Sequence, residues 1–193
     1  MKLHQLLISF ITMAIAGSFS VYASDAPTNI QKPSPVMIST PIALAKDVET
    51  IDGIVTALYH VISGGIGQAR NWNRMRSLFI PEARIMAIAP KRDSTDFGLR
   101  IMSISDYIAN SGPVLIETGF REKEISRKTD QWGELAQVFT TYETILDKDG
   151  TTKRGINSVQ LMHDGARWWI VSLLFEAERD QLRLPENYLK PSK

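Results

Sequence analysis

The sequence of 193 residues has no cysteine and only three histidines, two of which, His60 and His163, follow the first 23 residues. Without cysteine the chain forms no disulfides, so its stability must come from a hydrophobic core, and its hydrophobic content of 44% suits a globular domain. The two histidines lie on different predicted elements, and no carboxylate cluster has the spacing of metal ligands. We therefore expect neither a metal site nor a cofactor.

The chain also lacks an excess of charge of either sign. It has 22 basic and 21 acidic residues, and loss of Lys2 with a signal peptide would leave 21 of each. This balance gives no indication of nucleic acid as a partner. Beyond the first 23 residues the longest apolar run is Trp168–Phe175, which suits a buried strand, so we expect no membrane span there. The segment Gly64-Gly65-Ile66-Gly67 lacks the preceding strand and the lysine of a phosphate-binding loop.

The first 23 residues have the pattern of a secretory signal peptide. Lys2 supplies the positive start, Leu6–Ala16 is an uncharged apolar stretch, and Ala23 ends a cleavage motif before Ser24. An uncleaved membrane anchor is the weaker alternative, because the apolar stretch is shorter than the roughly 20 residues of a membrane-spanning helix. We therefore expect an exported protein, periplasmic or secreted. With no cysteine after the signal, lipid attachment there is excluded.

The rest of the chain is predicted to be one domain between two tails. Residues 24–45 contain three prolines among small polar residues and are expected to form a flexible leader. Residues 46–179 are expected to fold, and residues 180–193 form a C-terminal tail. Hydrophobic periodicity, a capping box at Ser103 and Asp106, and glycine turns predict an α+β fold with helices before a long meander. The expected elements are helices at 47–63, 71–79 and from Ser103 to Gly112-Pro113, and strands at 84–89, 115–127, 133–146, 153–163 and 166–178.

The turns between the last four strands predict how those strands pair. We expect a polar turn at Lys128–Gln131, a four-residue loop at Asp147–Gly150 and a two-residue turn at Asp164-Gly165. A shift of one residue in any pairing would turn each side chain to the other face. The expected partners are Phe120 with Phe139, Glu122 with Gln137, Gln137 with Gln160, Phe139 with Ser158, Thr141 with Ile156, and Glu143 with Arg154.

The first of these strands decides which face of the sheet meets the helices. Its charged residues Glu117, Arg121 and Lys123 should face water, so the Phe120 side should face inward. The opposite face remains apolar on the other strands, and such a patch usually indicates that another surface covers it. We expect a homodimer through this outer face; the alternative is that the C-terminal tail or the leader covers it. The predicted outer residues are Val138, Tyr142, Val159, Leu161, Trp168, Ile170 and Leu174.

Helices followed by a strongly bent antiparallel sheet resemble the nuclear transport factor 2-like superfamily, which includes SnoaL-like polyketide cyclases, ketosteroid isomerase and scytalone dehydratase. The segments Val138–Glu143, Arg154–Leu161 and Asp164–Ile170 carry the resemblance. It implies a cone-shaped α+β barrel, with the helices in the concave face of the sheet, a pocket at the wide end and dimers through the sheet. The catalytic residues of the named enzymes have no match here: neither the aspartate base with its tyrosine and protonated aspartate nor a histidine pair.

A row of polar residues is predicted on the inner face, at Glu122, Gln137 and Gln160. Buried polar groups must form hydrogen bonds, so the row either contacts a ligand or is a structural ladder. Glu122 is a candidate general base if burial raises its pKa, and His60 is a weaker catalytic candidate. Arg154 either pairs with Glu143 or binds a ligand carboxylate. The expected walls of the pocket are Phe120, Phe139, Trp169, Tyr107 and Trp72.

Three functions are compatible with the sequence. The first is an exported domain that binds a small apolar or amphipathic molecule without catalysis. The second is an isomerase, dehydratase or cyclase that transfers protons through Glu122 or His60. The third is a protein-interaction module that docks a different protein on its outer face. The sequence leaves open whether the chain is an enzyme.

Overall fold

The computed structural model describes residues 40–190, so the predicted signal peptide and residues 24–39 of the predicted leader lie outside the described residues. Within 40–190, no helix is long and apolar enough to cross a membrane. The helices are α1 (Ala45–Val48), α2 (Ile51–Ile62), α3 (Trp72–Arg76), α4 (Ile104–Thr118) and the short 3-10 helix η1 (Glu186–Tyr188). The strands are β1 (Phe79–Pro90), β2 (Phe97–Ser103), β3 (Phe120–Trp132), β4 (Leu135–Leu146), β5 (Thr152–His163) and β6 (Trp168–Ala177).

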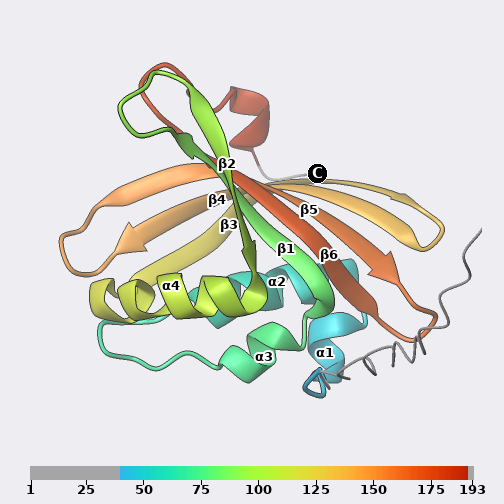
Figure 1. The fold of residues 1–193 in the computed structure, drawn as a ribbon. Helices are drawn as coiled ribbons and strands as arrows, with labels where there is room; N and C mark the ends of the chain where they lie inside the picture. The colour runs from blue at the N-terminus through green and yellow to red at the C-terminus, as the bar shows by residue number, and fades with distance from the viewer. Residues whose placement is uncertain (1–39, 191–193) are drawn as a thin grey trace, which may run out of the picture. The chain divides into compact units, whose positions relative to one another are not determined.

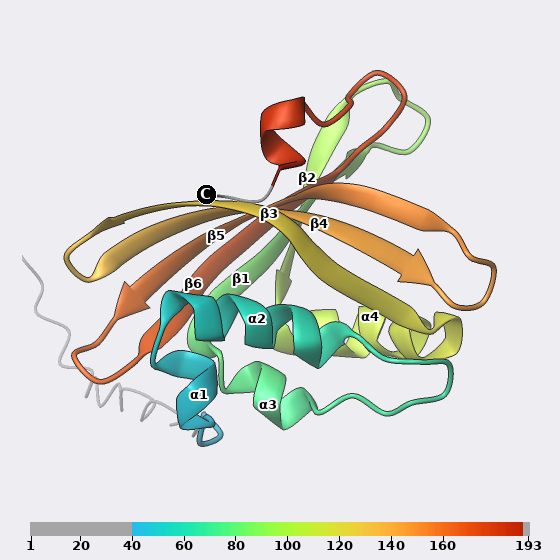
Figure 2. The same cartoon turned by 180° about the vertical axis from the view of Figure 1, so that it is seen from behind.

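These strands form one sheet in the order β2-β1-β6-β5-β4-β3. The sheet curves over α2, α3 and α4, which lie together on one side of it (Figures 1 and 2). The predicted α+β fold, with helices against the concave face of a bent sheet, is confirmed. Two details of the prediction are wrong. β1 runs parallel to β6, so the sheet is mixed, and β2 and β3 are its edges, so it does not close into a barrel.

α3 and α4 begin within one residue of their predicted starts, whereas α2 begins four residues later than predicted and ends one residue earlier. Residues 47–63 contain two helices, because Thr50 caps α2 by accepting a hydrogen bond from Gly53 N at 2.9 Å. The capping box of Ser103 and Asp106 at the start of α4 is confirmed. However, α4 continues through Gly112 and Pro113 to Thr118, and it ends at Gly119 in the left-handed conformation. The strand predicted at 84–89 is the second half of β1, and β2 was not predicted.

The turn between β3 and β4 differs most from its prediction. Lys128–Gln131 belong to β3, and the turn lies at Gly133-Glu134, where Gly133 has a φ of 56°. Glycine adopts this φ at little cost, so the turn forms at Gly133 although Lys128–Gln131 are more polar. Together with a bulge between Glu124 and Ser126 of β3, this turn pairs Phe120 with Leu146 instead of Phe139 and Glu122 with Thr144 instead of Gln137. The four predicted pairs between β4 and β5 are confirmed.

This shift inverts the predicted faces of β4 and β5. The turn alone would move the pairing by eight residues and keep the faces; the bulge in β3 reduces the shift to seven for Phe120 (146 against 139), and an odd shift exchanges the two faces. Phe120 and Glu122 face the helices as predicted, but the side chains expected beside them on β4 and β5 lie on the outer face. A bulge between β5 and β6 brings Trp168 and Ile170 inward together with Leu173 and Phe175.

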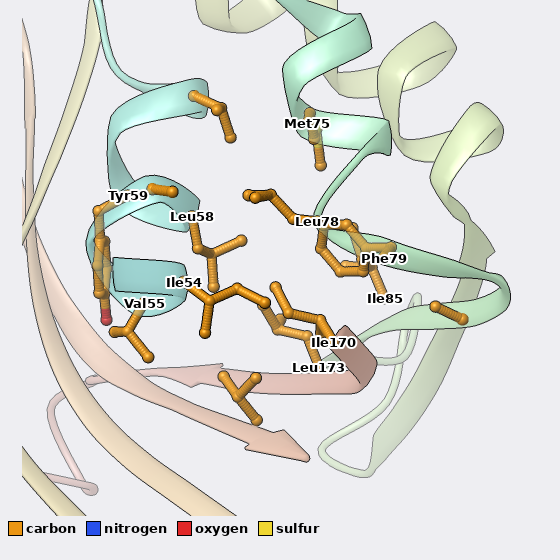
Figure 3. Close-up of a cluster of buried hydrophobic side chains, with 14 of the residues drawn as sticks. Ile54, Val55, Leu58, Tyr59, Met75, Leu78, Phe79, Ile85, Ile170 and Leu173 are labelled. Carbon is orange, nitrogen blue, oxygen red and sulfur yellow. The ribbon is translucent and has the colours of Figure 1, made fainter. Parts of the chain in front are cut away.

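The inner face carries the hydrophobic core. Figure 3 shows Ile170 and Leu173 of β6 packed against Ile54 and Leu58 of α2. The prediction that Val138, Tyr142, Val159, Leu161, Trp168 and Ile170 face outward is therefore wrong, because each is at most 6% exposed in this core. Since they are buried, these residues offer no surface to a second copy. The homodimer itself stays a prediction.

The described part of the C-terminal tail lies on the outer face of the sheet (Figures 1 and 2). Glu178 forms an ion pair with Arg154 at 3.0 Å, and the rings of Tyr188 and Phe139 are 5.5 Å apart. Between the tail and the sheet is a hollow of about 280 Å³. Its apolar lining includes Phe139, Ile156, Leu174, Leu182 and Leu184. The tail therefore covers part of the outer face, as the alternative to the dimer predicts.

A buried arginine joins the ends of two helices to the start of β3. Arg70 donates hydrogen bonds to the carbonyl oxygens of Ile62 (3.0 Å), Gly64 (2.7 Å) and Leu115 (3.1 Å). A cation is favourable beside the carbonyl ends of α2 and α4. Phe120 also accepts a longer bond from Arg70, at 3.5 Å, so this contact positions the strand that carries Glu122.

Candidate functional site

A cavity of about 530 Å³ lies between α4 and the inner face of the sheet. This volume is within the usual range of small-molecule pockets. The wall is mainly apolar, with a few polar groups contributed by α4 and by β3, β4 and β5. Its apolar residues include Leu58, Ile62, Met75, Ile85, Leu115, Phe120, Leu173 and Phe175, and its polar residues include Tyr107, Glu122, Tyr142, Thr144 and Asn157.

A small residue makes room for Tyr142 in this wall. Gly155 pairs with Tyr142 across β4 and β5, and a Cβ atom on Gly155 would lie 2.3 Å from the Tyr142 hydroxyl oxygen. The same Cβ would lie 2.3 Å from the carbonyl oxygen of Glu176. Glycine at position 155 therefore lets the tyrosine side chain lie across β5.

Glu122 is held by contacts to its backbone and to its carboxylate. Its N–H donates to Ser63 Oγ at 2.9 Å, just beyond α2, and Ser63 Oγ lies 2.7 Å from the Tyr59 carbonyl oxygen, to which it donates. Thr144 Oγ1 donates to Glu122 Oε2 at 2.7 Å. The backbone of Glu122 is thus held from the end of α2 and its carboxylate from β4, and the side chain lines the cavity.

Burial raises the pKa of Glu122 to about 7, while hydrogen bonds from Thr144 and Asn157 partly oppose this increase. A carboxyl group with this pKa is present in both protonation states near neutral pH. It can therefore donate a hydrogen bond when protonated, or accept a proton when ionised. Glu122 is the one acidic residue among those that line the cavity.

Two tyrosines share the wall with Glu122. Burial, followed by the charge of Glu122, raises the pKa of both Tyr107 and Tyr142, so both hydroxyls stay protonated. Within residues 40–190 neither hydroxyl has a hydrogen-bond partner in the protein. These two donors and the Glu122 carboxyl are available to a polar atom of a ligand.

A chain of hydrogen bonds continues from the cavity beneath the sheet. Asn157 Nδ2 donates to the Tyr59 hydroxyl at 3.1 Å, which is 2.9 Å from Thr140 Oγ1. Thr140 Oγ1 donates to Glu124 Oε1 at 2.5 Å, and Glu124 forms an ion pair with Arg127 at 2.6 Å. Every member of this chain is satisfied by a neighbour, so it holds Asn157 in place beside Glu122.

Of the predicted site residues, Glu122, Phe120 and Tyr107 line the cavity. The polar row of Glu122, Gln137 and Gln160 does not occur, because the two glutamines lie on the outer face. There Gln137 Nε2 donates to Ser158 Oγ at 2.9 Å, and Gln160 Oε1 accepts from Ser172 Oγ at 3.2 Å.

The other predicted wall and catalytic residues also lie elsewhere. Phe139 contacts Tyr188 of the tail, and Trp169 Nε1 donates to Asp164 Oδ2 at 2.6 Å. Trp72 packs against Gly112 of α4, outside the cavity.

His60 also lies outside the cavity, and the ion pair predicted between Glu143 and Arg154 does not form. His60 is exposed, and its Nδ1 lies 3.0 Å from Arg74 Nη1. Arg154 pairs with Glu178, whereas Glu143, its expected partner, pairs with Lys123 at 2.9 Å. In residues 40–190 no three histidine, cysteine or acidic side chains gather in a way that could hold a metal ion.

Sequence reasoning missed Tyr142, Thr144 and Asn157. All three depend on the register between β3 and β4, which the turn and a bulge in β3 set together. Gly133 was a signal for the turn, but a two-residue turn there would by itself set Glu122 opposite Ile145; the bulge between Glu124 and Ser126 of β3, which no sequence pattern indicated, brings Tyr142 and Thr144 to the face of Glu122.

Solved structures of other proteins share this fold. A Streptomyces avermitilis protein, provisionally named a dehydratase of the NTF2-like family, has a TM-score of 0.51 at 14% identity, over 69% of this chain and 96% of its own. The chain has the nuclear transport factor 2-like fold. The β subunit of a Novosphingobium aromaticivorans protein, provisionally named an aromatic-ring-hydroxylating dioxygenase, has a TM-score of 0.50 at 14% identity, over 75% of this chain and 95% of its own.

A Nostoc punctiforme protein of unknown function, described as having a cystatin-like fold, also matches. It has a TM-score of 0.51 at 8% identity, over 67% of this chain and 90% of its own. No family model and no curated protein matches the sequence. The nuclear transport factor 2-like resemblance predicted from the sheet motifs is confirmed for the fold. At such identities the likeness does not extend to activity.

Proposed function

We propose that this chain is an exported domain with the nuclear transport factor 2-like fold that binds a small apolar or amphipathic molecule. The observation that carries the proposal is the cavity of about 530 Å³, with Glu122 in its otherwise apolar wall. Apolar walls with a few convergent polar groups are typical of ligand sites. Here the free polar groups are the carboxyl of Glu122 and the hydroxyls of Tyr107 and Tyr142.

The size and polarity of the wall limit what the cavity can bind. Leu58, Leu173 and Phe175 favour an apolar body, whose burial contributes roughly 25 cal/mol per Å². One oxygen-bearing group of the ligand would then meet Glu122 and a tyrosine hydroxyl. A ligand lacking such a group would leave these polar groups unpaired in the cavity, at a cost of about 1–3 kcal/mol for each one that loses contact with water.

Native mass spectrometry of the purified protein, followed by identification of released small molecules, tests this function. The variant Asn110→Trp places a large side chain on an exposed residue of α4 that lines the cavity and not the hollow under the tail, so it should reduce the bound fraction. Ala166→Trp, in the exposed β5–β6 turn, is the matched control and should leave binding unchanged. Equal occupancy in both variants would show that the cavity is not the binding site.

One observation favours a second candidate, a proton-transferring enzyme of the isomerase, dehydratase or cyclase type. The pKa of Glu122 is raised to about 7, which suits a general base or acid at neutral pH. The hydroxyls of Tyr107 and Tyr142 could stabilise negative charge on a substrate oxygen, since they are donors without a protein partner among residues 40–190.

Deuterium exchange separates binding from proton transfer. If Glu122 is a base, a bound carbonyl compound in D₂O should gain deuterium at the carbon next to its carbonyl group. Glu122→Gln should abolish this exchange and preserve binding, because glutamine keeps the size and hydrogen-bonding capacity of the side chain. Exchange that persists in Glu122→Gln would exclude Glu122 as the base.

A further inference from the structure

The cavity has basic residues at its rim and a single carboxyl group inside it, and the inference drawn from this rests on the proposed binding function. Besides Glu122, the charged residues that line the cavity are Arg100 of β2 and Lys153 of β5. Both cations are exposed, whereas Glu122 is partly buried. The rim of the cavity is therefore positive, and its interior holds a carboxyl group that is neutral in part at pH 7.

The strand pairing places both cations on the inner face. Lys153 pairs with Thr144, which pairs with Glu122, so these three residues form a row across β5, β4 and β3. At about 4.8 Å between strands, the Lys153 backbone lies roughly 10 Å from that of Glu122. Arg100 pairs with Ala87 and Ala87 with Phe175, so an apolar wall residue lies between Arg100 and the polar groups of β5.

Neither cation is neutralised by a close acid. In the described range, neither Arg100 nor Lys153 forms an ion pair with a carboxylate within 4.0 Å. Some other exposed basic side chains in residues 40–190 do have such partners: Arg121 pairs with Asp147 at 2.8 Å, and Lys148 pairs with Glu117 at 2.7 Å. The positive charge at the rim is thus available to a ligand.

We propose that the ligand is an amphipathic anion. Its apolar body fills the cavity, a neutral hydroxyl or carbonyl group meets Glu122 and a tyrosine hydroxyl, and its anionic group stays at the rim near Arg100 or Lys153. An anionic group inside the cavity would instead meet the charge of ionised Glu122 and lose its water. This arrangement predicts a fixed orientation, with the charged end outward.

A matched set of ten-carbon probes tests the charge preference by isothermal titration calorimetry at pH 7, below micelle-forming concentrations. Decanoate should bind more tightly than decan-1-ol, and decyltrimethylammonium should bind most weakly. The orientation predicts that 10-hydroxydecanoate binds at least as tightly as decanoate, because its far hydroxyl can reach Glu122. The double variant Arg100→Gln with Lys153→Gln should weaken decanoate by about three- to tenfold and leave decan-1-ol unchanged.

Two controls connect the result to the cavity. Arg92→Gln removes a charge from an exposed loop residue outside the cavity and should leave all affinities unchanged, while Asn110→Trp should weaken every probe. If the neutral and anionic probes bind equally and Asn110→Trp weakens both, the anion preference is wrong and the binding function stands. If no probe binds and native mass spectrometry finds no released molecule, the binding function and the anion preference both fail.

Discussion

Glu122 and Thr144 are direct partners on β3 and β4, and the Thr144 hydroxyl donates a 2.7 Å hydrogen bond to the Glu122 carboxylate. The bond favours the ionised carboxyl and so opposes the effect of burial on its pKa. The balance of these two effects leaves Glu122 with a pKa of about 7 inside an apolar cavity.

Removing this donor should raise the pKa of Glu122 further. In Thr144→Val the carboxylate loses a bond that lowers its pKa, and valine retains the shape of threonine. NMR titration of the ¹³C-labelled carboxyl group measures the change. Thr152→Val, at an exposed position of β5, should leave the Glu122 pKa unchanged. A decrease in Thr144→Val would contradict the assigned effect of the bond.

Folding stability should depend on pH through Glu122. Its folded pKa of about 7 exceeds the unfolded value of about 4.3, so the folded state binds the proton more tightly. This group therefore stabilises the fold least at high pH: stability should fall as the pH rises from about 4.5 to about 8, through the folded pKa, and stay level above that. By linkage, the loss is at most about 3 kcal/mol.

Urea unfolding between pH 4.5 and 8.5 measures this contribution as the difference between the wild type and Glu122→Gln. The other titrating groups are common to both proteins and cancel in the difference. Glu122→Gln should gain stability relative to the wild type as the pH rises. A difference that stays constant across this range would show that Glu122 titrates normally in the fold.

Gly155→Ala should destabilise the protein. The added methyl group would lie 2.3 Å from both the Tyr142 hydroxyl oxygen and the Glu176 carbonyl oxygen. The carbonyl oxygen belongs to the backbone of β6, so it cannot move aside as the end of a flexible side chain can. Overpacking of this kind costs typically about 1–3 kcal/mol. Thermal or urea unfolding measures it. Gly98→Ala is the control, because the nearest atom there, 3.2 Å away, belongs to the flexible side chain of Lys91.

We predict a homodimer through the outer face of the sheet, with the exposed apolar residues of β2 at the contact. Leu99 and Ile101 are 53% and 60% exposed there, beside Met86 and Ile88 of β1. Ile101→Glu should convert the dimer to a folded monomer in sedimentation experiments. Ile170→Glu should instead unfold the domain, since Ile170 is 1% exposed. A wild type that sediments as a monomer at micromolar concentration would leave the tail as the sole cover of the outer face.

Export is predicted to include cleavage between Ala23 and Ser24, because the start of the chain has a basic, an apolar and a small-residue region in that order. Intact mass of the protein recovered from the periplasm or medium should correspond to a chain that begins at Ser24. Recovery of the chain from the cytoplasm with Met1 or the first 23 residues still attached would contradict export.

The succession of elements was predictable where local patterns are strong. The α2 face, the capping box at Ser103 and the β4–β5 register all depend on residues close together in sequence, and all are confirmed. β2 was missed since its residues Phe97–Ser103 alternate weakly and include Gly98, and a strand at a sheet edge is stabilised by the neighbour it pairs with.

The site was harder to predict than the fold. Glu122 faces inward in either register, because its alternation with Arg121 and Lys123 is local to β3. Its companions were wrong, because the misplaced turn moved the pairing by eight residues and an unpredicted bulge between Glu124 and Ser126 changed this to seven, which turns Tyr142 inward in place of Gln137. Polarity favoured Lys128–Gln131 as the turn, but the free energy of burying Val138, Val159 and Leu161 under the helices selects the register that combines Gly133 in the turn with the bulge in β3.

Patterns along the chain were therefore enough for the α+β class, the order of the last four strands and the inward direction of Glu122. Contacts between distant segments set the rest. Tyr59 of α2, Thr140 of β4 and Asn157 of β5 meet only when the sheet curves over the helices. The raised pKa of Glu122 likewise comes from burial by residues far from it in sequence. Register and burial are properties of the packed chain, because each strand's partner, and the water each side chain loses, depend on segments that lie far away in sequence.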